Sequence, residues 1–191
     1  MPKRSYGNVI ARLLTLVLLA GLAQPAHAAD WRMDAGASTL GFIAMQGSTR
    51  VEGGFRQFSA DIHFDPAALD RTRITVVIPI ASVFAGARDR DQALPTADWF
   101  NAARFPSARF QAKRLEAAGG DRYQLTADLT IRDVTQEVTL PITIVITGTQ
   151  AVARGELVID RTRFGVGQGG FATGSLVATS VTIQFSLTAT R

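Results

Sequence analysis

The longest unbroken run of charged residues in the sequence, Arg88-Asp89-Arg90-Asp91, is the first candidate for polar chemistry. Guanidinium groups donate several hydrogen bonds in a fixed planar arrangement, which suits a phosphate or a quinone carbonyl. Arg88, Arg90 and Asp91 are therefore possible contacts for a ligand head group. The same residues can instead cap a short helix or tie it to neighbouring strand ends. We favour the structural role.

A glycine-rich segment, Gly165 to Gly170, has the spacing of a dinucleotide-binding fingerprint. That chemistry needs a helix N-terminus directly after the glycines, and here the next pattern is a β-strand. We interpret the segment as a flexible loop at the edge of the fold. Arg161 and Arg163, just before it, pose the same choice between ligand contact and structural support.

His63 is the only His beyond residue 28, and the sequence has no Cys. A metal site usually needs several His or Cys ligands, and a His base needs a nucleophile beside it. We expect no metal site, no catalytic residues and no cofactor, and we interpret His63 as an exposed side chain on a strand.

Residues 1–28 have the pattern of a cleaved secretory signal peptide. A basic start is followed by a short apolar run, Leu13 to Ala23, and by Ala26-His27-Ala28, which resembles a cleavage site. The apolar run is shorter than the roughly 20 residues that span a bilayer, so we expect no transmembrane anchor after cleavage. The predicted location is the periplasm, with residues 29–191 forming one domain.

Charge gives little indication of a charged partner once the signal peptide is removed. Cleavage takes away three of the 20 Lys and Arg residues and none of the 16 acidic residues, which leaves a net charge of +1. Nucleic-acid binding needs basic residues clustered on one face, and the sequence gives no sign of such a cluster. We expect no nucleic-acid partner.

Alternation of apolar and polar residues dominates the rest of the chain and predicts β-strands with one apolar face. About eight antiparallel strands are expected: Trp31 to Gln46, Val51 to Phe64, Ile74 to Ile80, a strand around Phe110, Tyr123 to Ile131, Val138 to Ile146, one around Leu157 and Ile159, and Val181 to Ala189. Such strands hide their apolar faces either in a sandwich or in a closed barrel. We favour the barrel, because closure removes exposed edges.

One sizeable block, Phe84 to Phe110, breaks this pattern and predicts a short helical excursion between two strands. It resembles the signature of the YceI-like family of exported lipid-binding proteins. The residues that match are Arg90-Asp91, Leu94, Ala97-Asp98-Trp99-Phe100-Asn101, Phe105-Pro106, Ala108 and Phe110. Further matches lie before and after the block: Gly54-Phe55, Phe58, Ile62 to Pro66, Leu129 to Ile131, Val134-Thr135, Val138, Leu140 and Phe164 to Gly167.

The resemblance covers the whole mature chain and implies an all-β fold, an extended eight-stranded antiparallel barrel of lipocalin-like form. It also implies a tunnel that holds a polyisoprenoid chain or an isoprenoid quinone. The sequence departs from the family pattern at two places. Gln46 stands where many relatives have a His, and Asp133 stands where many have Gly in a turn. Asp tolerates left-handed backbone, so we expect the turn to survive.

The large apolar residues of the strands and of the central block are the predicted wall of this tunnel. An apolar wall binds its ligand by burial, at roughly 0.8 kcal/mol per CH₂ group, and needs no decisive polar residue. Met45 is a further wall candidate, because Met adapts to irregular surfaces. The predicted ligand-binding residues are Phe42, Phe55, Phe58, Phe64, Ile78, Phe84, Leu94, Trp99, Phe100, Phe110, Leu129, Leu140, Ile142, Phe164, Ile183 and Phe185.

Three functional hypotheses remain open on the sequence. The leading one is a non-catalytic carrier of an isoprenoid quinone or polyprenyl phosphate, with a membrane quinone-dependent protein as a possible partner. The second is a stress-response or protein-interaction module whose barrel is filled by its own side chains. The third, a hydrolase or redox enzyme, lacks a clustered polar site in the sequence.

Overall fold

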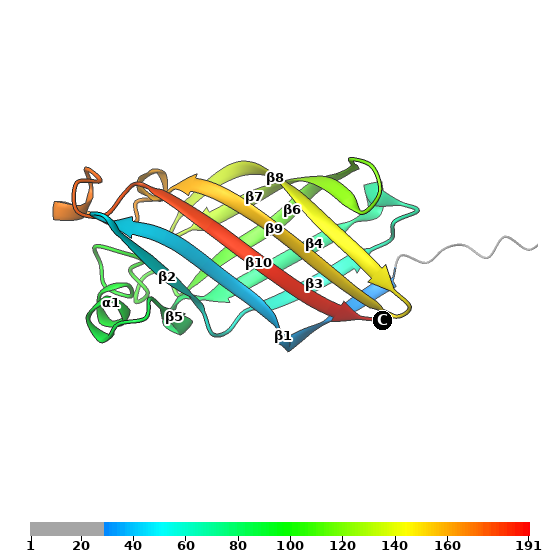
Figure 1. Ribbon diagram of the computed structural model, residues 1–191, viewed down its shortest axis with the longest axis horizontal. Coiled ribbons are helices and arrows are strands. Elements are labelled where there is room, and N and C mark those ends of the chain that lie inside the picture. The colour runs from blue at the N-terminus through cyan, green and yellow to red at the C-terminus, as the bar shows by residue number, and fades with distance from the viewer. Residues whose placement is uncertain (1–28) are drawn as a thin grey trace, which may run out of the picture.

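Eight antiparallel strands close into a barrel in the computed structural model, which describes residues 29–191 (Figure 1). The predicted signal peptide lies outside the described residues. The closing contact joins the first and last strands, β1 and β10, so the predicted barrel and its strand number are confirmed. In order around the barrel the strands are β1 (Ala29–Gln46), β3 (Ser59–Phe64), β4 (Arg73–Pro79), β6 (Ser107–Ala117), β7 (Arg122–Ile131), β8 (Val134–Thr147), β9 (Gln150–Asp160) and β10 (Ser180–Thr190).

Two further strands extend this wall beside β1, and they correct the prediction of one strand from Val51 to Phe64. β2 (Thr49–Phe55) pairs with the end of β1, whereas β3 pairs with its beginning. The chain therefore leaves the sheet at Arg56, whose N–H donates to the carbonyl of Ser82 at 3.0 Å. β5 (Val83–Phe84) pairs with the end of β2.

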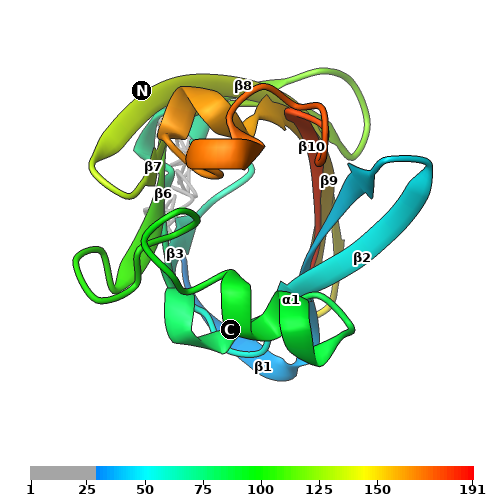
Figure 2. The same cartoon turned by 90° about the vertical axis from the view of Figure 1, so that its left-hand side faces the viewer.

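The helical excursion is confirmed as α1 (Arg88–Ala93), which lies at one end of the barrel. Figure 2 looks at this end and shows α1 together with the β1–β2 turn and the connection between β9 and β10. We call it the α1 end. The short 3₁₀ helices of the chain are η1 (Leu69–Arg71), η2 (Ile80–Ser82), η3 (Arg161–Phe164) and η4 (Gly169–Phe171). None of the helices in residues 29–191 is long and apolar enough to cross a membrane.

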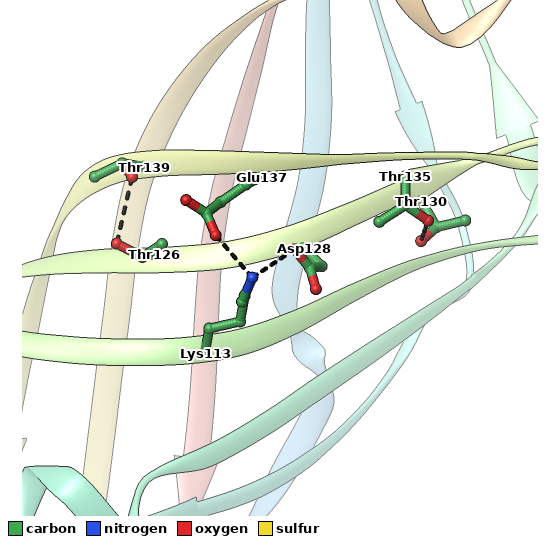
Figure 3. A network of polar contacts seen from close by, with 7 residues as sticks. All are labelled: Lys113, Thr126, Asp128, Thr130, Thr135, Glu137 and Thr139. Carbon is green, nitrogen blue, oxygen red and sulfur yellow. Dashed lines mark hydrogen bonds and ion pairs between the residues drawn. The ribbon is translucent and has the colours of Figure 1, made fainter.

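The outer faces of β6, β7 and β8 are joined by side-chain contacts (Figure 3). Lys113 Nζ lies 2.7 Å from Glu137 Oε2 and 3.4 Å from Asp128 Oδ1. Hydrogen bonding to Glu137 raises the pKa of Lys113, and Lys113 in turn lowers the pKa of Glu137. Lys113 is also the extra residue where the β6–β7 register shifts, a bulge that returns Leu115 to the interior.

The wall is less continuous between β8 and β9, whose pairing covers only residues 142–147 and 150–155. Both hairpins that flank β8 have two-residue turns, and the residues next to such a turn are hydrogen-bonded to each other. Counting from these turns, the backbone groups of the even-numbered residues of β8 hydrogen-bond to β7, and those of the odd-numbered residues point toward β9. The next rung would need an N–H from Pro141, and proline has none. Pro141 therefore ends the β8–β9 ladder. We call the unpaired stretch beyond it the β8–β9 seam.

The turn between β7 and β8 differs in detail from the expectation at Asp133. The left-handed residue is Arg132, with φ of 59°, and Asp133 does not have positive φ. The turn survives, as predicted, but the unusual backbone falls one residue earlier.

Candidate functional site

A cavity of about 410 Å³ runs through the barrel interior, within the range typical of small-molecule sites. Its wall draws on both buried clusters of the core. One cluster, around Trp31, Phe64 and Leu140, fills the end away from α1, and the other, around Ile78 and Trp99, lies at the α1 end. The cavity touches members of both, so it extends along the barrel axis.

Fourteen of the sixteen predicted wall residues line this cavity, because they share the inward phase of the strands or the inner side of the central block. They are Phe42, Phe55, Phe58, Phe64, Ile78, Leu94, Trp99, Phe100, Phe110, Leu129, Leu140, Ile142, Ile183 and Phe185. Sequence reasoning omitted other inward residues of the same strands, such as Leu40, Ile62, Leu125 and Leu157, which also line it. The alternation of apolar and polar residues along each strand already indicated that these side chains point inward.

Phe84 and Phe164 do not line the cavity, and Met45 does not either. Phe84 stands on β5, outside the closed barrel, where the Arg56 guanidinium lies 4.4 Å from its ring centre. Phe164 is buried in η3, which packs against β8 beside the β8–β9 seam. Met45 is exposed on the β1–β2 hairpin.

Aromatic rings gather where the cavity reaches the α1 end. The ring centres of Phe42 and Phe55 are 6.2 Å apart, and those of Phe55 and Phe100 are 6.0 Å apart, both in edge-to-face geometry. Trp99 packs against Phe171 at 4.9 Å. These rings come from β1, β2, the central block and η4, so four separate parts of the chain build one aromatic girdle.

Polar side chains line the cavity only at the α1 end, as far as residues 29–191 show. They are Gln46, Asp89, Arg90 and Arg161. Gln46 and Asp89 are also exposed to solvent, whereas the apolar lining residues are buried or half-buried. The cavity therefore opens to solvent at the α1 end and becomes wholly apolar farther in.

Two residues of the Arg88–Asp91 run, Arg90 and Asp91, make the structural contacts that we favoured. The Asp91 carboxylate accepts a hydrogen bond from the Ala85 N–H at 2.5 Å, and Arg90 Nε donates to the Ala85 carbonyl at 3.0 Å. These bonds tie α1 to the end of β5. Arg90 nevertheless lines the cavity, whereas Arg88 and Asp91 do not.

Sequence reasoning left the role of Arg161 open between ligand contact and structural support, and its contacts are those of a structural residue. Its side chain is buried and donates to five backbone carbonyls, at 2.6 to 3.3 Å, all in the connection between β9 and β10. Its Cζ lies 5.4 Å from the Trp99 ring centre. Burial lowers the pKa of Arg161, and the nearby Asp160 opposes that change. Arg163, by contrast, is exposed.

The glycine-rich segment is held in place by Arg161 and by the central block. Gly167 has φ of 83°, and a side chain there would clash with the Arg161 guanidinium. The N–H groups of Gly167 and Gln168 donate to the Asp98 carbonyl at 2.8 and 2.6 Å. Arg132 donates to the Trp99 and Gly165 carbonyls. The segment thus fixes Trp99 at the cavity opening, and these hydrogen bonds correct the prediction of a flexible loop.

His63 is half-buried, and its prediction as an exposed residue needs correction. Antiparallel pairing of β1 and β3 places Asp30 opposite His63, and His63 Nδ1 lies 2.7 Å from Asp30 Oδ1. The part of the chain that the structure describes holds no group of three or more His, Cys, Asp or Glu residues placed to bind a metal ion.

Comparison with known proteins agrees with this geometry. The family model described as "YceI-like domain" matches residues 31–189. The chain belongs to the YceI-like family. It is 32% identical to a UPF0312 protein of Shewanella denitrificans over 136 residues, which cover 70% of each chain.

Solved structures show the same YceI-like barrel. BcnA of Burkholderia cenocepacia is 34% identical, with a TM-score of 0.80 over 83% of this chain and 99% of that one. A polyisoprenoid-binding domain from Saccharophagus degradans has a TM-score of 0.66 at 17% identity, over 84% of this chain and 97% of that one. At that identity the second likeness shows a shared fold.

Proposed function

We propose that this YceI-like protein binds one long isoprenoid lipid, an isoprenoid quinone or a polyprenyl phosphate, in the barrel cavity and acts as a carrier without catalysis. The observation that carries the proposal is the cavity itself: it is apolar along its length and polar only at the α1 end. A ligand that matches this wall has an apolar tail and one polar head. The Saccharophagus degradans protein with the same fold is a polyisoprenoid-binding domain, which supports the choice of lipid.

The head group lies at the α1 end in this proposal. Arg90 uses its Nε for the Ala85 carbonyl, and its terminal nitrogens, which make no hydrogen bond within residues 29–191, can donate to a phosphate or a quinone carbonyl. Gln46 lines the same opening and can donate or accept a hydrogen bond there. Arg88 and Asp91 do not line the cavity, so we assign them no contact with the ligand.

The proposed place of action is the periplasm, which rests on the signal-peptide pattern of residues 1–28. A carrier of quinone would deliver to or receive from a quinone-dependent membrane protein. The alternative of a filled barrel expects a solid interior, and a cavity of about 410 Å³ does not fit that expectation.

Tryptophan fluorescence gives a direct test, because both Trp residues of the chain, Trp31 and Trp99, line the cavity. Added ubiquinone should quench their emission in a saturable way. Replacing Ala153, which lines the cavity, by Phe fills the space that the tail needs and should weaken binding by roughly tenfold or more. The matched control is Val152→Phe, because Val152 precedes it on β9 and does not line the cavity.

Two results would contradict the proposal. One is the absence of saturable quenching by ubiquinone together with no uptake of a polyprenyl phosphate. The other is equal binding by the Ala153→Phe and Val152→Phe variants, which would place the lipid outside the barrel.

A further inference from the structure

Four large apolar side chains are exposed in residues 29–191: Met45, Val145, Val158 and Leu176. Val145 and Val158 stand on the outer faces of β8 and β9. Met45 and Leu176 lie in different parts of the sequence, on β1 and on the connection between β9 and β10. Scattered exposed apolar residues are ordinary, but two that the fold brings together at a cavity opening call for a reason.

The backbone fixes Met45 and Leu176 as neighbours. The Ala178 N–H donates to the Met45 carbonyl at 2.8 Å, and the Gly47 N–H donates to the Leu176 carbonyl at 3.1 Å. These two bonds flank an antiparallel bridge between Gln46 and Val177. Met45 and Leu176 lie diagonally across this bridge, at a spacing that long side chains can span.

The two segments joined by this bridge have one face toward the cavity and one face toward solvent. Gln46 and Val177 line the cavity, and Met45 and Leu176, one residue away on each segment, are exposed outside it. The exposed apolar pair therefore stands on the rim of the opening, beside the place where a lipid tail would enter.

The connection that carries Leu176 has a net positive charge, which favours an anionic surface. The connection from Arg161 to Thr179 contains two Arg residues and no acidic residue, and its Arg163 is exposed. On α1 the exposed Arg88 is balanced by the exposed Asp89, so the positive charge comes from the connection. Basic side chains near apolar ones are typical of segments that rest on anionic lipid head groups.

We propose that the α1 end docks onto a bilayer containing anionic phospholipid, with Met45 and Leu176 entering the head-group region. This inference rests on the proposed function, because a lipid carrier benefits from passing its ligand between bilayer and cavity without exposing the tail to water. A few apolar side chains on a positively charged segment suit insertion into a lipid surface, whereas a protein partner usually covers a broad apolar core.

Flotation of the mature protein with vesicles of phosphatidylethanolamine and phosphatidylglycerol tests docking without any bound ligand. The double substitution Met45→Glu and Leu176→Glu should reduce the vesicle-bound fraction by roughly tenfold or more, because it replaces both apolar contacts by charges that anionic lipid repels. The matched control replaces the other exposed pair, Val145→Glu with Val158→Glu, and should float like the wild type.

The Met45→Glu and Leu176→Glu variant should also extract ubiquinone from the same vesicles more slowly than the wild type. Its affinity for detergent-dispersed ubiquinone should stay within about twofold of the wild-type value, since neither Met45 nor Leu176 lines the cavity. Equal flotation of the wild type and the Met45/Leu176 variant would overturn the proposal, and so would an equal loss in the Val145/Val158 control. Flotation as predicted without binding of ubiquinone or of a polyprenyl phosphate would support docking and refute the carrier function, so the two failures are distinguishable.

Discussion

Replacing Arg161 by Met removes five hydrogen bonds that hold the connection between β9 and β10 over the end of the barrel. Met keeps much of the apolar volume but donates nothing, so carbonyls such as those of the buried Val166 and Gly167 lose a partner. The contact with the Trp99 ring is lost as well.

The expected cost follows from these contacts. A hydrogen bond from a charged donor contributes about 1.5–3 kcal/mol, and an unpaired buried carbonyl costs about 1–3 kcal/mol. These terms are not additive, and part of the connection can move into water once it is released. We therefore expect a loss of about 3–5 kcal/mol in the free energy of unfolding.

Urea unfolding and amide hydrogen exchange are the assays. At a slope of about 2 kcal/mol per M, the midpoint should fall by roughly 2 M, and the Val166 and Gly167 amides should lose protection. Arg163→Met, an exposed neighbour, should change stability by less than about 0.5 kcal/mol. Arg161→Lys should recover only part of the lost free energy of unfolding, because an ammonium group has three donors for five carbonyls. An Arg161→Met variant within about 1 kcal/mol of wild type, with the two amides still protected, would refute the reasoning.

Three further changes test separate parts of the fold. Pro141→Thr supplies the missing N–H of the β8–β9 ladder, so amide exchange at Glu156 should slow by roughly tenfold or more; unchanged exchange would mean that another feature opens the seam. Gly155→Ala places a methyl group 2.7 Å from the Phe185 ring and should cost about 1–3 kcal/mol in thermal unfolding, and adding Phe185→Leu should restore most of the loss. Hydrogen bonds from the Thr162 hydroxyl and N–H lower the pKa of Asp160, so its stabilising effect is complete above the unfolded-state pKa of about 3.9 and is lost as pH falls through the lower folded-state value. Asp160→Asn should therefore be less stable than wild type at neutral pH and equal to it in acid. A stability difference that persists in acid would contradict this assignment.

The barrel could be predicted from the sequence because its strands alternate over long stretches. Residues such as Leu125, Leu140 and Ile183 keep the inward phase that a closed sheet requires. Bulges and breaks within strands could not be predicted from the alternation. The bulge at Lys113 and the break after Phe55 depend on which strand lies alongside, and a single sequence does not carry that pairing.

The predicted residues that line the cavity lie mostly on strands, where alternation fixes which side chains point inward. The two that do not line it, Phe84 and Phe164, were chosen because they are aromatic. Their positions depend on β5 and η3, short elements with no periodic signal. Arg161 illustrates the same limit for polar groups. Its carbonyl partners lie 5 to 17 residues along the chain, and only the folded connection brings them to one side chain.

Native mass spectrometry of the mature protein, purified without detergent from the cells that make it, tests the central claim most directly. If the cavity holds an isoprenoid lipid, the spectrum shows one adduct per chain, and solvent extraction of the same sample recovers a prenylated quinone or phosphate. The Ala153→Phe variant loses that adduct and the Val152→Phe variant keeps it. A protein mass without adduct that also takes up no added ubiquinone or polyprenyl phosphate would contradict the account.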